Sequence, residues 1–249
     1  MSNVILTFDI DWVPDFIIDF IAEKLIKQNV PATWFVTHPC DAVERLKNYP
    51  ELFELGIHPN FRPNSSHGKD PHEVIQYCLN LVPDAITMRT HGLIQAISLF
   101  DTIMRETQII ADVTTYMPHI PNLMPAEYWR EGRMMLRIPT YWQDELEMTR
   151  PQPIWDPNPL LSNGTGVKVF NFHPIHVYLN SVDSKPFSKI IERNPQLSKA
   201  NQPDLEEFIQ DGTGTLTLLQ NLLEVKANFI TLGEFARQFI AQKQVLLSS

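Results

Sequence analysis

Stretches with the spacing of strands and stretches with the spacing of helices alternate along this chain, and this alternation constrains its fold most strongly. Residues 3–11, NVILTFDID, have the two-residue period of a strand, with one apolar face and one face that ends in acids. Residues 14–29 have apolar side chains at helical spacing behind an initial proline, and residues 31–38 are typical of a second strand. Because strand–helix repeats build parallel sheets, we predict an α/β fold with a parallel sheet that is open or closed into a barrel.

The same alternation continues to the C-terminal end. Further helices are predicted at 41–54 (with a break at Pro50), 71–82, 94–106, 214–228 and 233–244. Further strands are predicted at 56–61, 85–92, 109–115, 134–142, 167–176 and 229–232. No repeat, low-complexity tract or linker divides the chain, so we expect one domain over residues 1–249, with residues 183–202 as a polar loop or lid.

Composition excludes several classes of partner. The net charge of −9 argues against binding to nucleic acids and to anionic membrane surfaces. The first residues lack the features of a signal peptide, and no stretch of about 18 apolar residues could span a membrane. Cys40 and Cys78 form no close pair, which is typical of a reduced compartment. We therefore expect a cytoplasmic protein without a transmembrane segment or a nucleic-acid partner.

Acids and histidines gather where the predicted strands end, which is where parallel α/β folds place functional side chains. These strand-end residues are Asp9, Asp11, His38, His58, Arg89, His91, Asp112, Asp144, His173 and His176. The first two acids share a strand face, with Cα atoms about 7 Å apart. At that distance each raises the pKa of the other unless a cation lies between them. Trp12 and Pro14 follow and would cover the acids, which favours a metal and proton-transfer site over a solvated strand end.

Histidines near these acids could complete a metal site. Two histidines and a carboxylate are the ligands typical of a catalytic Zn²⁺ with an open water position. His58 follows Gly56 at a predicted strand end, and His67 lies in the polar loop after it. Arg89 and His91 alternate on one strand face, so both can point into a common site. The sequence has no GxSxG elbow, phosphate loop or dinucleotide fingerprint, which disfavours those chemistries.

The motif TFDID, followed by a helix and the strand VPATWFV at 30–36, resembles the opening of the NodB-like polysaccharide deacetylases, carbohydrate esterase family 4. A Gly-x-His strand end at 56–58, an arginine at 89, a late histidine at 173 and the closing FITLGEFARQF follow in the family's order. The resemblance implies a distorted (β/α) barrel of about seven parallel strands that binds a divalent metal, most commonly Zn²⁺.

The resemblance also implies roles for individual residues. Asp9 corresponds to the general base, Arg89 to the arginine that orients it, and His173 to the general acid. Asp11 and His58 correspond to metal ligands.

Two departures mark a divergent member of the family. The usual His-x-x-x-His is interrupted, because the fourth residue after His58 is Arg62. We predict that His67 supplies the third metal ligand, with His91 and His176 as alternatives. The usual Arg-x-Pro is replaced by RTHG, which puts a histidine at the proline position.

The remaining predictions concern the surroundings of the site. Asp144 is predicted to tune His173, with Asp112 as the alternative. The residues predicted to contact substrate are His91, Trp12, Trp142 and His176.

Together these features predict a metal-dependent hydrolase that removes an acetyl group from an acetamido sugar in surface-polysaccharide biosynthesis, such as that of lipopolysaccharide. The sugar would be nucleotide-linked, lipid-linked or part of an oligosaccharide. One alternative is a catalytically silent carbohydrate-binding protein, with Trp12, Trp142 and Trp155 along a sugar cleft. The other is a metal-dependent C–N hydrolase whose substrate is not an acetamide.

Overall fold

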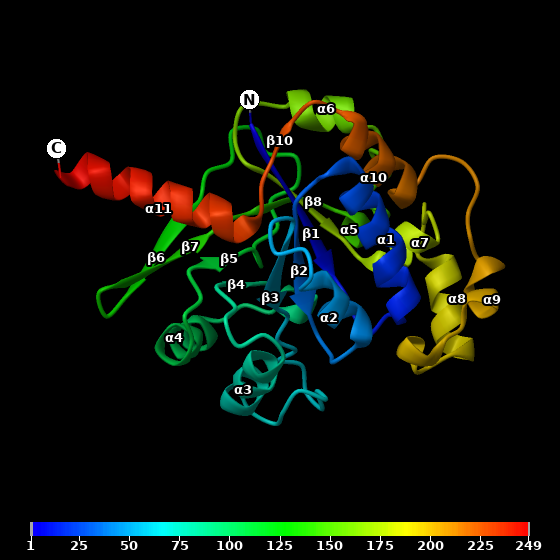
Figure 1. Cartoon of the computed structure of the whole chain (residues 1–249), viewed down its shortest axis with the longest axis horizontal. Helices are drawn as coiled ribbons and strands as arrows, with labels where there is room; N and C mark the ends of the chain where they lie inside the picture. Colours follow the sequence, from blue (N-terminus) through cyan, green and yellow to red (C-terminus); the bar gives the residue numbers. More distant parts are fainter. Residues whose placement is uncertain (1, 249) are drawn as a thin grey trace.

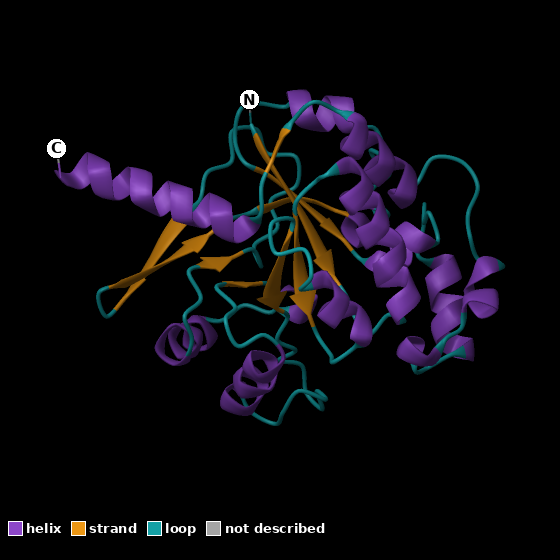
Figure 2. Cartoon of the chain, viewed as in Figure 1, coloured by secondary structure: helices purple, strands orange, loops and turns teal. Residues whose placement is uncertain are grey.

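The computed structural model describes residues 2–248, with side chains as far as residue 245. Within this part, ten strands form one curled sheet surrounded by helices (Figures 1 and 2). The strands are β1 (Asn3–Asp9), β2 (Ala32–Val36), β3 (Phe53–Ile57), β4 (Thr87–Met88), β5 (Ala111–Asp112), β6 (Ala126–Arg130), β7 (Arg133–Arg137), β8 (Thr140–Gln143), β9 (Lys168–Phe172) and β10 (Asn228–Phe229). The α-helices are α1 (Asp15–Gln28), α2 (Asp41–Leu46), α3 (Pro71–Leu81), α4 (Ile97–Glu106), α5 (Asp144–Glu147), α6 (Pro157–Ser162), α7 (Pro174–Tyr178), α8 (Lys185–Arg193), α9 (Gln202–Glu206), α10 (Thr215–Glu224) and α11 (Leu232–Ser248). Two 3₁₀ turns, η1 (His91–Leu93) and η2 (Leu197–Lys199), complete the described elements.

The sheet runs in the order β6-β7-β5-β4-β3-β2-β1-β9-β8, and β10 pairs with the start of β1. All neighbours are parallel except β6 and β7, which form an antiparallel hairpin. Beyond β5 the chain runs beside β8, where the Thr140 amide donates to the Thr115 carbonyl at 2.7 Å and the Met117 amide donates to the Thr140 carbonyl at 2.9 Å. These bonds join the two flanks of the sheet into a distorted barrel of β5, β4, β3, β2, β1, β9 and β8. The predicted α/β barrel with about seven parallel strands is therefore confirmed.

Strand β1 lies inside the sheet, between β2 and β9, and shows the predicted alternation. On one face Phe8 stacks on Trp34 of β2 and Phe172 of β9, at ring-centroid distances of 4.5 and 5.6 Å. On the other face Thr7 and Asp9 accept hydrogen bonds from the buried Arg89. The apolar face anchors the strand in the core, and the polar face points into the barrel at the end of the strand where a site can form.

Prolines explain three places where the elements differ from those predicted. The helix predicted at 41–54 ends at Leu46, and β3 begins at Phe53, because Pro50 cannot continue a helix. The single strand predicted at 134–142 is two strands separated at Pro139: β7 pairs with β5, while β8 pairs with β9. Strand β9 ends at Phe172, and Pro174 begins α7 at the position that tolerates a missing amide hydrogen.

The polar segment 183–202 is not a plain loop. It contains α8, η2 and the first residue of α9, and it is held to the protein by the buried side chains of Ile190 and Leu197. The polar residues of α8 hide this in the sequence, because its apolar positions are few. Among the described residues, no helix is both long and apolar enough to cross a membrane.

Candidate active site

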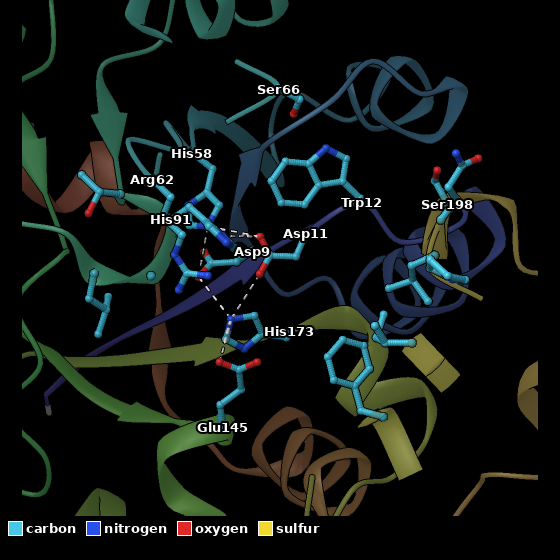
Figure 3. A pocket seen from close by; sticks show the side chains of 18 of the residues that line it. Asp9, Asp11, Trp12, His58, Arg62, Ser66, His91, Glu145, His173 and Ser198 are labelled. Carbon is cyan, nitrogen blue, oxygen red and sulfur yellow. Dashed lines mark hydrogen bonds and ion pairs between the residues drawn. The ribbon is translucent and has the colours of Figure 1, made fainter. Parts of the chain in front are cut away.

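A pocket of about 610 Å³ opens at the carboxyl ends of the barrel strands. It is lined by side chains that follow β1, β3 and β9, by the turn at 90–93 and by the segment 187–198 (Figure 3). Its volume lies in the range typical of small-molecule sites. The carboxyl edge of the sheet is where the sequence predicted the site.

The two acids of TFDID reach the pocket by a route that strand periodicity did not predict. Strand β1 ends at Asp9, and Asp11 and Trp12 have left-handed backbone, with φ of 32° and 56°. The Val13 amide donates to the Ile10 carbonyl at 2.9 Å and closes this turn. Asp11 is therefore brought beside Asp9 by a strained turn rather than by sharing its strand face, and such strain is concentrated at functional sites.

Asp11, His58 and His91 form a group that could hold a divalent metal ion. Their ligand atoms all lie within 4.8 Å of one another. Asp11 Oδ1 is 3.3 Å from His58 Nε2 and 3.1 Å from His91 Nδ1. This is the set of two imidazole nitrogens and one carboxylate that suits a catalytic Zn²⁺.

The orientation of His58 supports this interpretation. Its Nδ1 lies 2.8 Å from the carbonyl oxygen of Arg89, to which it donates in the tautomer that leaves a lone pair on Nε2. That Nε2 is buried and makes no hydrogen bond to any described residue. Burial alone lowers the pKa of His58, but Asp9 and Asp11 outweigh it and raise the pKa. A buried nitrogen that faces two carboxylates is a position where a cation would be stabilised.

His67 does not belong to this group, which corrects the prediction that it is the third ligand. Its Nδ1 accepts a hydrogen bond from the Asn60 amide at 3.2 Å and lies 3.5 Å from Cys78 Sγ. Its ring stacks on Tyr77 with a centroid distance of 4.5 Å. Burial lowers the pKa of His67 to about 4, which keeps the ring neutral and able to accept. His67 thus fixes the loop after β3, and His91, one of the two predicted alternatives, lies beside Asp11 and His58 instead.

Two residues predicted to bind substrate lie in the interior instead. Trp142 is fully buried and packs on Phe172, with a centroid distance of 5.0 Å, and on Trp155. A register shift in β8 between Thr140 and Trp142 turns this ring to the side of the sheet that Phe172 occupies. His176 is buried behind His173, and its Nδ1 lies 3.1 Å from Ser181 Oγ. Neither lines the pocket.

The other two residues predicted to bind substrate, Trp12 and His91, do line the pocket. Their rings are in edge contact, with centroids 5.4 Å apart. Trp12 therefore forms a wall beside the proposed metal ligands.

Asp9 is held at both oxygens. Arg89 Nη1 donates to Asp9 Oδ1 at 2.8 Å, and Asn171 Nδ2 donates to Asp9 Oδ2 at 2.8 Å. Burial alone raises the pKa of Asp9, but Arg89, with His58 and His173, reverses this and lowers it. Asp9 is therefore a carboxylate at neutral pH.

Arg89 is oriented by a network that sequence reasoning missed. Its Nη1 also donates to Asn171 Oδ1 at 2.6 Å, and its Nη2 donates to Thr140 Oγ1 at 3.1 Å. The asparagine between two phenylalanines in the strand VKVFNF is the signal that could have pointed to Asn171.

His173 faces the acids from the opposite side of the pocket. Asp144 Oδ1 lies 2.6 Å from His173 Nδ1, and Asp144 Oδ2 accepts from the His173 amide at 2.7 Å. Asp112, the alternative partner, is paired with Arg137 at 3.0 Å. The predicted pairing of Asp144 with His173 is therefore the one that the structure contains.

Glu145 was not among the predicted site residues, although it follows Asp144 directly. Its Oε2 lies 3.8 Å from His173 Nε2, and Figure 3 shows His173 between Glu145 and the two acids of TFDID. His173 lowers the pKa of Glu145 to about 2. Burial alone lowers the pKa of His173, but Glu145 and Asp144 raise it well above its usual value. The imidazole is thus protonated at neutral pH.

Comparison with known proteins agrees with this geometry. A family model described as WbmS-like polysaccharide deacetylase matches residues 6–190. The chain belongs to this family. The predicted membership among the polysaccharide deacetylases is thereby confirmed.

Solved structures give further likenesses. A protein of Bordetella bronchiseptica, described as a candidate polysaccharide deacetylase involved in O-antigen biosynthesis, is 32% identical, with a TM-score of 0.75 over 88% of this chain and 89% of that one. A family 4 acetyl xylan esterase from Clostridium thermocellum is 15% identical, with a TM-score of 0.44 over 94% of this chain and 89% of that one. No curated protein sequence matches the chain.

Proposed function

We propose that this WbmS-like protein is a metal-dependent hydrolase that removes the acetyl group from an N-acetylated sugar during surface-polysaccharide biosynthesis. The observation that carries the proposal is the meeting of three groups in one pocket: the cluster of Asp11, His58 and His91, the carboxylate of Asp9 held by Arg89 and Asn171, and His173 paired with Asp144. The Bordetella bronchiseptica relative, described for O-antigen biosynthesis, supports the assignment to surface polysaccharide. Cys40 and Cys78 are both free thiols, which supports a cytoplasmic location.

The residues present fit a divalent cation, most simply Zn²⁺. Asp11, His58 and His91 would hold it, since His58 Nε2 is buried without a hydrogen bond and the donor set is two nitrogens and an oxygen. The hydrogen bond from His58 to the Arg89 carbonyl is the outer contact that orients a metal-bound imidazole. When bound, such an ion would polarise the acetamide carbonyl and lower the pKa of a water molecule.

The protein's own groups would move the protons. Asp9 Oδ2 faces the pocket, 3.9 Å from His58 Nε2 and 3.7 Å from His173 Nε2, and would accept the proton of the attacking water. Arg89 and Asn171 keep Asp9 ionised and fixed in position. His173, protonated and held by Asp144 through Nδ1, would donate from Nε2 to the leaving nitrogen. Base and acid therefore lie in one pocket with opposite charges, as hydrolysis of an amide requires.

The interrupted His-x-x-x-His had suggested a silent binding protein. His91 places a nitrogen beside Asp11 and His58 where the motif lacks one, and neither Trp142 nor Trp155 lines the pocket that contains these residues. No observation on the described residues favours the binding protein.

The test is acetate release from a panel of N-acetyl sugars, free, nucleotide-linked and lipid-linked, by zinc-loaded protein. Asp9→Asn is expected to lower the rate by about 10²- to 10⁴-fold, because it removes the general base. Full activity of Asp9→Asn would refute the mechanism. Zinc-loaded protein that releases acetate from no member of the panel would refute the proposed substrate class and favour another C–N hydrolase.

A further inference from the structure

Arg62 lies at the rim of the pocket, at the position where the family's His-x-x-x-His would have its second histidine. Because His91 provides the third group beside Asp11 and His58, a metal site there needs no ligand from residue 62. Arginine at this position does more than remove a possible ligand, because it adds a long side chain with a positive charge. Figure 3 places Arg62 near His91, on the side of the pocket opposite Ser198.

The guanidinium lies against the pocket wall at Gly92. Gly92 has φ of +66°, and a Cβ added there would come within 2.9 Å of both Cζ and Nε of Arg62. The glycine therefore serves two needs: it adopts a left-handed backbone, and it leaves space for the planar group above it.

The backbone of Arg62 is fixed, whereas its charged end is unpaired. Asn60 Oδ1 accepts from the Arg62 amide at 3.1 Å, and the Asn60 amide donates to His67 Nδ1. The His91 amide donates to the Pro59 carbonyl at 3.0 Å, which ties this loop to the proposed metal ligands. Over residues 2–245, the guanidinium forms no hydrogen bond or ion pair. A loop held by these hydrogen bonds thus presents an unpaired cation to the pocket.

The charges around the pocket indicate what this cation would meet. Arg62 is the one lysine or arginine among the residues that line it, and the lining also contains the carboxylates Asp9, Asp11 and Glu145. Asp9 is paired with Arg89 and Glu145 lies beside His173, so these cations are already engaged, whereas the guanidinium of Arg62 remains available to an anionic group on a substrate. The planar fork of arginine matches two oxygens of a phosphate or a carboxylate.

We propose that Arg62 recognises an anionic group on the acetamido sugar, either the phosphate of an anomeric linkage or a carboxylate of the sugar itself. This inference rests on the proposed function, since it assumes that the pocket receives such a sugar. It makes Arg62 a specificity residue and narrows the substrate class to anionic acetamido sugars.

The test measures dissociation constants of zinc-loaded protein by calorimetry for two matched pairs of probes. One pair is N-acetylglucosamine 1-phosphate and methyl N-acetylglucosaminide; the other is N-acetylglucosaminuronic acid and N-acetylglucosamine. In at least one pair the anionic member is expected to bind about 10- to 100-fold more tightly, the effect of a charged hydrogen bond. The Arg62→Gln variant is expected to reduce that ratio to about 1, and the pair that responds identifies phosphate or carboxylate.

Arg105→Gln is the matched control, because Arg105 is an exposed arginine on α4 that does not line the pocket. It should retain the wild-type preference, and Arg62→Gln should bind as much zinc as wild type. The proposal is overturned if wild-type protein prefers neither anionic sugar, or if the preference survives Arg62→Gln. Because binding is measured, failure to release acetate would refute the proposed function without deciding this inference.

Discussion

The two sides of the pocket use the same ring in opposite ways. On the side of β3, His58 Nδ1 meets a neutral acceptor, the backbone carbonyl of Arg89 at 2.8 Å. On the side of β9, His173 Nδ1 meets a carboxylate, Asp144, at 2.6 Å. Both rings are buried, and both Nε2 atoms face the acids of TFDID. The carbonyl at Nδ1 of His58 therefore leaves its Nε2 suited to binding a cation, whereas the carboxylate at Nδ1 of His173 makes its Nε2 suited to carrying a proton.

The largest expected effect comes from removing each ring in turn. His173→Gln should retain stoichiometric zinc but lose about 10²- to 10⁴-fold in rate, since it removes the general acid. His58→Gln should lose the zinc together with the activity, because it removes a ligand. Metal analysis and acetate release on the same preparations check both results. The proposed difference between the two rings would be refuted if the His173 variant loses its zinc or the His58 variant keeps it.

The second test concerns which histidine joins His58. His91→Gln is expected to weaken zinc affinity by about 100-fold or more, the upper end of the effects seen even for outer contacts. His67→Gln is the matched control: it should keep zinc and lower the free energy of unfolding by about 1–3 kcal/mol, because the Asn60 amide loses its acceptor. Zinc titration and thermal unfolding measure the two effects. The opposite pattern, with zinc lost only from His67→Gln, would restore the ligand predicted from the sequence.

The third test alters the group behind His173. Asp144→Asn should lower the rate by about 10- to 100-fold. It should also move the alkaline limit of activity to lower pH. The general acid works only when protonated, so activity disappears as pH rises through its pKa. Burial lowers the pKa of His173, whereas Glu145 and Asp144 raise it, so removing the Asp144 charge lowers it.

A pH–rate profile of Asp144→Asn measures this shift. Asp112→Asn serves as the control, because Asp112 is a buried strand-end acid that pairs with Arg137 rather than with His173. It should cost stability without moving the alkaline limit. An unchanged limit in Asp144→Asn would show that the carboxylate does not set the protonation of His173.

The smallest expected effects concern two tryptophans: Trp142, which packs on Phe172 of β9, and Trp12, which contacts His91. Trp142→Phe should cost about 1–2 kcal/mol of unfolding free energy, because it leaves a gap against Phe172. Trp12→Phe should change stability by less than about 0.5 kcal/mol but raise KM, because Trp12 lines the pocket. Chemical denaturation and steady-state kinetics separate the two. A stability loss confined to Trp12→Phe would reverse their assignment to pocket and core.

The sequence allowed much of the barrel to be predicted, since hydrophobic periodicity is a local property. It located the strand that ends in Asp9 and the later strand ends at His58, Arg89 and His173. The predicted bounds were less accurate where prolines interrupt the elements. At Pro139, for example, the one predicted strand is two strands, which pair on opposite flanks of the sheet.

The histidine set shows what spacing could not provide. His67 is closer to His58 in sequence, but β3 pairs with β4 through Ile57 and Met88, and this pairing carries His91 to the same edge as His58. The loop after β3 then turns His67 onto Tyr77. Proximity along the chain therefore selected a histidine that does not meet Asp11 and His58, because strand pairing decides which side chains meet.

By itself, the sequence determined the fold class, the edge of the sheet that holds the site, and the residue types gathered there, because these depend on patterns within single segments. Only the tertiary structure decided which histidines face Asp11, which tryptophan is buried, and where the charged end of Arg62 lies. Those outcomes depend on strand register, on the left-handed turn at Asp11 and on the groups that orient each ring, and the register and the orienting groups arise only when distant segments pack together.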